Sequence, residues 1–330
     1  MDTNTQANTN TKINTNHKTN FMKVMEFNRA FDMVSNEPQE YSCYYEDSNK
    51  NIHFDPLRNC RTNIFVDSPS TITLRLDLIK EELEELNVAI NENDIIEQRD
   101  ACADILYVVY GMCDILGIAI DDFFSSKSEK HVLKYNSENS NNYINNNNYI
   151  EKMVELTQNG SIQITNYNYI KAFKNEFLGF YMNSVTNEEL LLLIKNNLQI
   201  NYINLELNTT LEVSETYTIK QKFECISERL YNLLCWTYMM TIFLGVNADE
   251  DFSIVHDSNM SKLCDSEQDA SDTVNDYEIK YKAGKSPYDS PYYYYLPNLD
   301  KWIVKNLSSG KALKNIKYKK VCFSNSRFVF

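Results

Sequence analysis

Glycine is scarce in this chain, with only 7 among 330 residues. The sequence contains no G-x-x-x-x-G-K-S/T, no G-x-G-x-x-G and no G-x-S-x-G. Each of these motifs relies on glycine, because the backbone must turn sharply or approach a ligand closely. The scarcity therefore argues against a phosphate-binding glycine loop and against a hydrolase nucleophile elbow.

Metal-binding patterns of histidine and cysteine are also missing. The 4 histidines are scattered, and none of the 8 cysteines forms a C-x-x-C pair. We therefore expect no His/Cys zinc site. Several cysteines fall within helix-like patterns, where a thiol behaves as a small apolar side chain. We interpret them as reduced core thiols, which predicts an intracellular, cytoplasmic protein.

Positive charge and long apolar runs are lacking as well. The chain has 32 Lys and Arg against 46 Asp and Glu, a net charge of −14. A sequence-independent nucleic-acid binder needs a basic face, so this function is disfavoured. No uncharged apolar run reaches the roughly 18 residues of a membrane span, so we expect no membrane partner. Residues 233–246 instead predict a buried core helix, and we expect no secretory signal.

Two asparagine-rich tracts, 1–20 and 136–150, divide the chain, and we expect both to be disordered. The expected domains are a tail, a helical repeat, a linker, a second helical repeat and a C-terminal extension, at 1–20, 21–135, 136–150, 151–265 and 266–330. In the extension, Trp302–Asn306 and Lys311–Tyr318 predict a small β-hairpin.

Helical periodicity is clearest in the first half. Apolar residues spaced three and four apart predict helices over 22–34, 72–90 and 95–116. Asp94 can cap the start of the third helix, and Gly117 marks its end. The connection between the second and third helices is short, so they should run antiparallel.

An internal repeat relates the two halves. LIKEELEEL (78–86) aligns with LIKNNLQIN (193–201), ADILYVVYGMCDILGI (103–118) with YNLLCWTYMMTIFLGV (231–246), and EFNRAF (26–31) loosely with AFKNEF (172–177). Three matches in the same order indicate a tandem duplication. We predict a mainly α fold in which two helical bundles form an intrachain pseudo-dimer. A homodimer whose two chains supply complementary halves is the alternative.

Acidic residues gather on the second and third predicted helices. Glu82 and Glu85 are three residues apart, as are Glu97 and Asp100, so each pair shares a helix face. Asp104 lies one turn further on. Because the helices should be antiparallel, these carboxylates can converge, and a hard divalent cation such as Mg²⁺ would offset their repulsion.

Two explanations that involve no metal compete with a metal site. Glu81 and Glu84 read more readily as solvated residues than as ligands. Asp100 and Asp104 lie in a helix with few other charges, where an unpartnered acid is costly. Arg99 is the one nearby cation, and a structural salt bridge with it could explain one of these two aspartates.

The acidic pattern resembles the MazG-like, all-α nucleoside triphosphate pyrophosphohydrolases. Their E-E-x-x-E and E-x-x-D motifs stand here as residues 81–85 and 97–100. The resemblance extends to 254–263, and the tail segment 309–316 is similar to a phage and large-virus branch labelled phosphoribosyl-ATP pyrophosphohydrolase-like. The resemblance covers most of 21–134 and 170–320.

The resemblance implies an enzyme that cleaves a nucleoside triphosphate into a monophosphate and pyrophosphate, for house-cleaning or control of the nucleotide pool. It implies Mg²⁺ as cofactor, with Mn²⁺ as an alternative. The implied metal ligands are Glu82, Glu85, Glu97 and Asp100, which together with Glu81, a candidate proton acceptor, form the catalytic set. The implied substrate-binding residues are Asp104, Asn259 and Lys262. Asp104 could also replace Asp100 as the primary ligand.

The second repeat looks degenerate at this site. Asn197, Ile200 and Cys225 align with three of the four presumed ligands, and only Glu228 keeps an acid. The resemblance therefore implies one working site, with acids from the first repeat and Asn259 and Lys262 from the second. A catalytically inactive helical scaffold or binding protein derived from the same fold is the alternative function.

Overall fold

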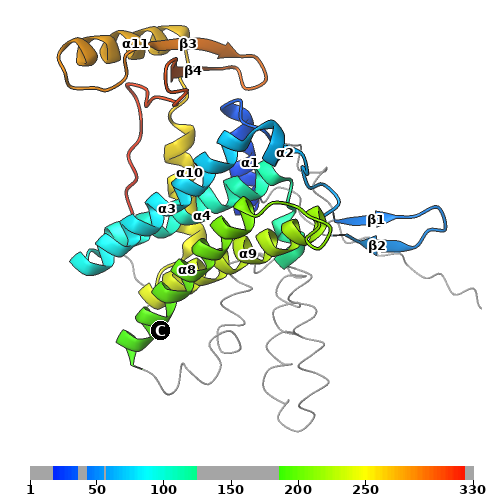
Figure 1. Cartoon of the computed structure of the whole chain (residues 1–330). Helices are drawn as coiled ribbons and strands as arrows, with labels where there is room; N and C mark the ends of the chain where they lie inside the picture. Colours follow the sequence, from blue (N-terminus) through cyan, green and yellow to red (C-terminus); the bar gives the residue numbers. More distant parts are fainter. Residues whose placement is uncertain (1–17, 36–42, 56, 125–185, 324–330) are drawn as a thin grey trace, which may run out of the picture.

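The computed structural model describes residues 18–35, 43–55, 57–124 and 186–323. It is mainly helical with a small C-terminal hairpin, as the sequence predicts (Figure 1). In chain order the elements are α1 (Asn20–Ala30), β1 (Tyr44–Glu46), β2 (Ile52–Phe54), α2 (Ile64–Asp67), α3 (Pro69–Glu92), α4 (Ile95–Leu116), α8 (Asn187–Thr210), α9 (Ile219–Leu244), α10 (Ala248–Met260), α11 (Glu267–Lys282), β3 (Pro291–Leu296) and β4 (Lys301–Asn306).

The hairpin of α3 and α4 follows from local sequence. Pro69 starts α3, where its missing N–H costs nothing. Asn93 takes a left-handed conformation with φ 56°, and the Asp94 side chain accepts hydrogen bonds from the backbone N–H of Ile96 and Glu97. Gly117 ends α4 at φ 73°. The predicted limits 95–116 and both end signals are confirmed, because each satisfies backbone groups that the helix leaves unpaired.

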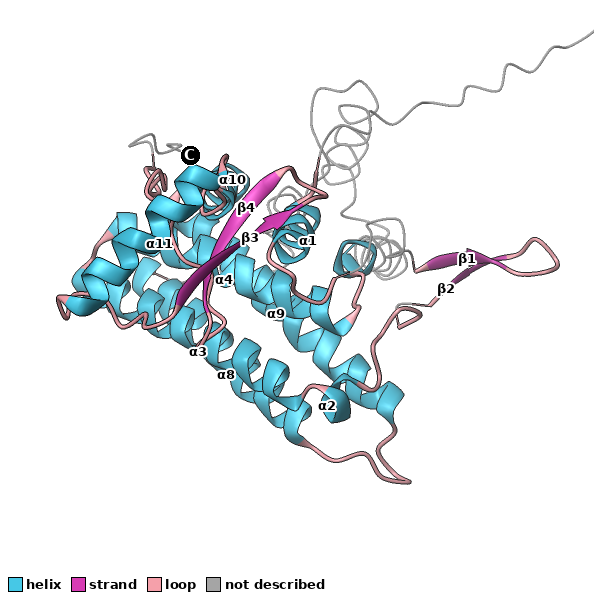
Figure 2. Ribbon diagram, turned by 90° about the horizontal axis from the view of Figure 1, so that it is seen from above, coloured by secondary structure: helices cyan, strands magenta, loops and turns pink. Residues whose placement is uncertain are grey.

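A second helical hairpin, α8 with α9, packs against the first within the same chain. α4 lies against α9, and α3 lies beside α8 (Figures 1 and 2). One continuous apolar core joins all four helices. At its centre the hydroxyl groups of Tyr110 and Tyr238, which are aligned in the repeat, are 2.7 Å apart. Gly245 ends α9 in the left-handed conformation, φ 69°, just as Gly117 ends α4.

Each half of the chain also packs against helices of the other half. α10 follows α9 but packs on α4 and α1. In the first half, Phe123 and Phe124 follow α4, and their rings lie 5.4 and 4.7 Å from the ring of Tyr231 on α9. These crossed contacts place α10 beside α4, the helix that carries Asp100 and Asp104.

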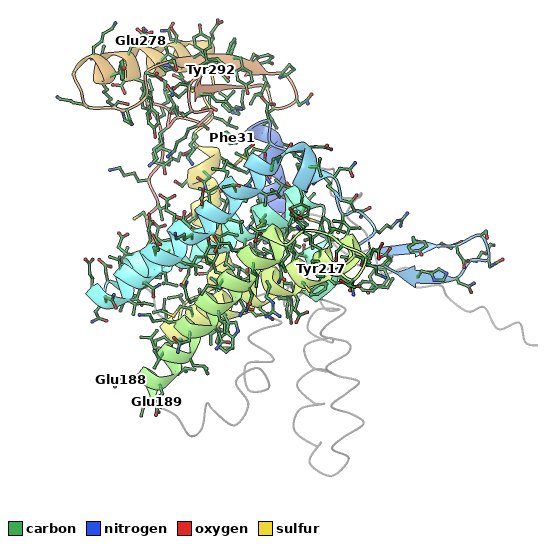
Figure 3. All side chains as sticks on the ribbon, in the orientation of Figure 1. Phe31, Glu188, Glu189, Tyr217, Glu278 and Tyr292 are labelled. Carbon is green, nitrogen blue, oxygen red and sulfur yellow. The ribbon has the colours of Figure 1, made fainter. Side chains whose placement is uncertain are left out.

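The C-terminal extension forms a separate layer of α11, β3 and β4 over the ends of α1 and α10 (Figures 1 and 3). Phe31, labelled in Figure 3, lies in an apolar cluster with Leu263, Leu296 and Ile303 that joins this layer to the helices. Lys305 adds a hydrogen bond from its ammonium group to the carbonyl oxygen of Phe31.

The hairpin is confirmed, but the strand predicted over Lys311–Tyr318 is wrong. The run Tyr292–Tyr295 belongs to β3, which pairs antiparallel with β4 from Pro291↔Asn306 to Leu296↔Lys301. Successive tyrosines point to opposite faces, so this run suits a strand packed on one side. The residues after β4 form only the isolated bridge Lys305↔Ala312, because side-chain contacts hold them along α10 instead.

The limit of the N-terminal tail is also corrected. We expected disorder through residue 20, yet Thr19 caps α1 and Asn20 is buried, with its amide donating to Asp249 at 2.7 Å. α1 therefore starts earlier than the predicted helix over 22–34, and it ends earlier, at Ala30. Residues 1–17, the linker 136–150 and the match at 172–177 lie outside the described residues.

Among the helices described, none is long and apolar enough to cross a membrane. All 8 cysteines lie in described positions and none forms a disulfide.

Candidate functional site

The acidic cluster lies where α3 and α4 face each other. Glu82 is half-buried beside the apolar stripe of α3, and Asp100 and Asp104 are half-buried one turn apart on α4. Glu85 and Glu97 are exposed at the edge of this group. The three half-buried acids, Glu82, Asp100 and Asp104, are therefore the best candidates for site residues. The exposed Glu85 and Glu97 can approach them only from the solvent side.

Two further glutamates on α3 point outward. Glu81 and Glu84 are exposed, as the competing interpretation expected, and Glu84 lies 4.0 Å from the ammonium group of Lys80. Glu81 still acts on the cluster, since its charge contributes to raising the pKa of both Glu82 and Glu85.

The inner acids are electrostatically coupled. Burial and then the charge of Asp104 raise the pKa of Glu82 to about 8. Burial and the charge of Glu97 raise the pKa of Asp100 to about 6, and burial and the charge of Asp100 raise that of Asp104 to about 7. Such coupling indicates that the carboxylates of the two helices are close enough for their charges to interact. Glu82 on α3 thus interacts with the charges of Asp100 and Asp104 on α4, while convergence of the carboxylates on a shared metal stays a prediction.

Arg99 does not serve these acids as a structural partner. Its guanidinium forms two hydrogen bonds to Asp251 on α10, at 2.9 and 2.7 Å, and both side chains are about 5% exposed or less. The competing hypothesis, in which Arg99 pairs with Asp100 or Asp104, is therefore corrected. Sequence alone could not supply Asp251, because it is 152 residues away.

α10 and the residues after it bring amide and ammonium groups to the cluster. The Lys262 ammonium donates to Asn259 Oδ1 at 2.7 Å and lies 5.8 Å from the ring centre of Phe27. Burial and the charge of Lys314 lower the pKa of Lys262 to about 8, against the opposing charge of Asp104. The prediction that Lys262 of the second half lies near the first-half acids agrees with this coupling.

Lys314 is a charged residue that sequence reasoning missed. Its charge lowers the pKa of both Asp100 and Asp104, although other causes dominate. The available signal was the lysine-rich run KALKNIKYKK, 311–320, in an otherwise acidic chain.

In their present positions, the carboxylate oxygens of the acidic cluster suit a hard cation only in part. Glu82 Oε2 and Asp100 Oδ1 are buried and have no hydrogen-bond partner, and buried carboxylate oxygens without partners suit an oxygen-seeking cation. Within the described ranges, however, no three His, Cys, Asp or Glu side chains surround a common point as a metal would require. Metal ligation would therefore need the exposed Glu85 and Glu97 side chains to turn inward.

The second half places amides where the first has acids. Asn201 Oδ1 accepts hydrogen bonds from Arg229 and Asn232, both at 3.2 Å. Asn197 donates to the backbone carbonyl of Leu193, and Ile200 is exposed. This neighbourhood is built from amide and guanidinium groups, which do not favour a divalent cation.

The raised pKa of Glu82 makes stability depend on pH. The folded protein holds the Glu82 proton between its ordinary pKa of 4.5 and about pH 8, whereas the unfolded chain releases it. The metal-free protein should therefore lose unfolding free energy as pH rises through this window. Glu82→Gln should reduce this loss, with the raised pKa values of Asp100 and Asp104 accounting for the remainder, and should stabilise the protein at pH 8.5 by about 1 kcal/mol, after allowance for solvent screening. Urea unfolding at pH 5 and 8.5 measures it, and an unchanged pH dependence in the variant would contradict it.

Comparisons with known proteins bear on the same region. Residues 58–131, which include α3 and α4, match the family model for phosphoribosyl-ATP pyrophosphohydrolase. Over 310 residues the chain is 30% identical to "Uncharacterized protein L479" of Acanthamoeba polyphaga mimivirus, covering 93% of this chain and 94% of that protein. No solved structure matches significantly. The matched model fits within the MazG-like all-α superfamily, and its family is one of pyrophosphohydrolases. The chain therefore belongs to the family of this mimivirus protein, with a region similar to phosphoribosyl-ATP pyrophosphohydrolases at its acidic cluster.

Proposed function

We propose that the protein is a Mg²⁺-dependent pyrophosphohydrolase that converts a nucleoside triphosphate into a monophosphate and pyrophosphate. One observation carries the proposal: the coupled carboxylates of Glu82, Asp100 and Asp104 lie inside the matched region, and Asp104 also interacts with the charge of Lys262. A cluster of strongly perturbed acids beside a cation is typical of a functional site rather than of a solvated surface.

Each residue has a distinct task in this proposal. Glu82 and Asp100 would hold Mg²⁺, with Glu85 and Glu97 turning inward to complete the ligand set. Bound there, Mg²⁺ supplies charge neutralisation on the triphosphate and activation of water. Glu81, exposed beside the cluster, would accept a proton from the attacking water.

The opposite wall would bind substrate. Lys262 would contact a phosphate oxygen, where its charge stabilises negative charge that develops during attack. Asn259 positions Lys262, since its Oδ1 accepts the ammonium hydrogen bond. The charge of Asp104 interacts both with the other acids and with Lys262. Asp104 would therefore orient Lys262 or add a contact to the metal.

We further infer that the two halves arose by duplication and that only one kept a metal site. The aligned tyrosines that meet at the centre and the matching left-handed glycines after α4 and α9 support this inference. The amide environment of Asn197, Asn201 and Asn232 supports the loss of the second site.

A pyrophosphate-release screen over all ribo- and deoxyribonucleoside triphosphates tests the activity. With Mg²⁺, the protein should release pyrophosphate from at least one triphosphate, and chelation by EDTA should stop it. Absence of release from every substrate, with either Mg²⁺ or Mn²⁺, would favour the inactive scaffold, consistent with the lack of a preformed ligand group among the residues that the structure describes.

The asymmetry of the site can be measured with two variants. Lys262→Ala should raise KM for the triphosphate by roughly tenfold or more, because a charge-assisted contact contributes about 1.5–3 kcal/mol. Glu228→Gln, at a half-buried position of the second half, should change kcat and KM by less than about twofold, because the proposed site takes its acids from the first half. Steady-state values of kcat and KM for both variants, compared with the wild type, test whether only one half carries the working site. If Glu228→Gln were as damaging as Asp100→Asn, both halves would carry metal.

A further inference from the structure

The segment after β4, residues 311–323, forms what we term the C-terminal strap. It is unusually basic for a chain of net charge −14. Its lysines are Lys311, Lys314, Lys317, Lys319 and Lys320. In Figure 1 this red segment descends from the hairpin past α10 toward α3. Among these lysines, Lys317 pairs with Asp269 on α11, whereas the charge of Lys314 acts on Asp100 and Asp104 of the acidic cluster.

The strap is anchored beside Lys262. The Asn315 amide donates to the backbone carbonyls of Ser261 and Leu263, the residues on either side of Lys262. Further along, the Lys319 backbone N–H donates to Ser261 Oγ at 3.0 Å. Lys314 directly precedes Asn315, so these bonds hold it next to Lys262 in the fold.

The far end of the strap lies against the start of α4. The Phe323 ring stacks on the Arg99 guanidinium, whose central carbon is 4.8 Å from the ring centre. Arg99 directly precedes Asp100 in α4. The strap is thus fixed beside Lys262 by Asn315 and at Arg99 by Phe323, and Lys314 directly precedes the first of these anchors.

The charges of Lys314 and Lys262 repel each other, and a bound anion would relieve this repulsion. The Lys314 side chain is exposed, with its ammonium 4.6 Å from the Tyr318 ring centre, so it can reach a ligand that enters from solvent. Burial and then the charge of Lys314 lower the pKa of Lys262, so the two charges interact. A polyphosphate with several negative oxygens could contact both groups.

We propose that Lys314 of the C-terminal strap is a substrate-binding residue, which together with Lys262 contacts the phosphate chain of a polyphosphate ligand. The proposal deepens the function proposed above and names the phosphate chain, rather than the base, as the part that the strap recognises. It also gives the C-terminal extension a role, since the extension positions a substrate contact for a site built from α3 and α4.

The test uses the full chain, with inorganic tripolyphosphate in Mg²⁺ as the probe. Lys314→Ala should weaken tripolyphosphate binding about five- to tenfold in titration calorimetry, as loss of one partly exposed charge-assisted contact predicts. KM for a triphosphate should rise to a similar extent while kcat changes little. Lys314→Arg should bind within about twofold of the wild type, because the charge is kept. Lys320→Ala, an exposed lysine of the same strap, is the control with the same charge change.

The outcomes separate the two proposals. If the wild type hydrolyses triphosphates but Lys314→Ala behaves like Lys320→Ala, Lys314 only neutralises the acids and the inference is wrong. If Lys314→Ala lowers the melting temperature without changing tripolyphosphate binding, the role is structural and the inference is again overturned. If no triphosphate is hydrolysed, yet Lys314→Ala alone loses tripolyphosphate binding, the inference stands while the proposed activity falls.

Discussion

Glu82→Gln should lower kcat for triphosphate hydrolysis by about 100-fold or more, which corresponds to at least about 2.7 kcal/mol of transition-state stabilisation. Glu82 has a buried oxygen without a partner and the most strongly raised pKa of the cluster, so it lies where a cation would be held. The amide keeps the shape of the side chain but removes its charge. Asp100→Asn should act in the same way, for the same reason.

The fold should survive both substitutions, because removing one charge from a repelling group relieves repulsion. Glu84→Gln is the matched control: it lies on the same helix, is exposed and faces Lys80 rather than the cluster. Steady-state kinetics and circular dichroism on the three variants measure the effect. Full activity in Glu82→Gln, or equal loss in Glu84→Gln, would rule out Glu82 as a metal ligand.

The largest expected effect on stability lies at Arg99 and Asp251. Asp251→Ala should reduce the free energy of unfolding by about 3–5 kcal/mol, because it leaves the buried Arg99 guanidinium without its bidentate partner. The pair joins α4 to α10, so its loss also loosens the helix that precedes Lys262. Activity should therefore fall together with stability, in contrast to Glu82→Gln.

An exposed ion pair supplies the control for this prediction. Lys280 and Asp276 lie one turn apart on α11, with side chains 49% and 39% exposed, and Lys280→Ala should cost less than about 1 kcal/mol. Chemical denaturation of both variants gives the comparison. Equal losses from Asp251→Ala and Lys280→Ala would show that the buried pair contributes no more than a surface one.

Local patterns in the sequence predicted those features that depend on neighbouring residues. Apolar spacing predicted the first and last residues of α4 correctly. The Asp94 cap and the Gly117 ending were confirmed because both satisfy backbone groups within one turn. Spacing of three also put Glu82 and Glu85 on one helix face. The antiparallel hairpin then brought Asp100 and Asp104 toward Glu82, as its short connection required.

Contacts between residues far apart in the chain could not be predicted in this way. The partner of Arg99 is 152 residues away, and nothing in its local sequence distinguishes Asp251 from a solvated acid. The strand over 311–318 was wrong because side-chain anchors such as Asn315, rather than β-propensity, decide the path of that segment. Lys314 was overlooked for the same reason, since its neighbours belong to α4 and α10.

The most direct test of the proposed reaction identifies its products. A triphosphate that the screen shows to be hydrolysed should be incubated with the protein and Mg²⁺ and followed by phosphorus NMR. The account predicts equal amounts of nucleoside monophosphate and pyrophosphate, with none formed by Glu82→Gln. Release of orthophosphate with a nucleoside diphosphate would mean that the other phosphoric anhydride is cleaved, and would contradict the proposed function.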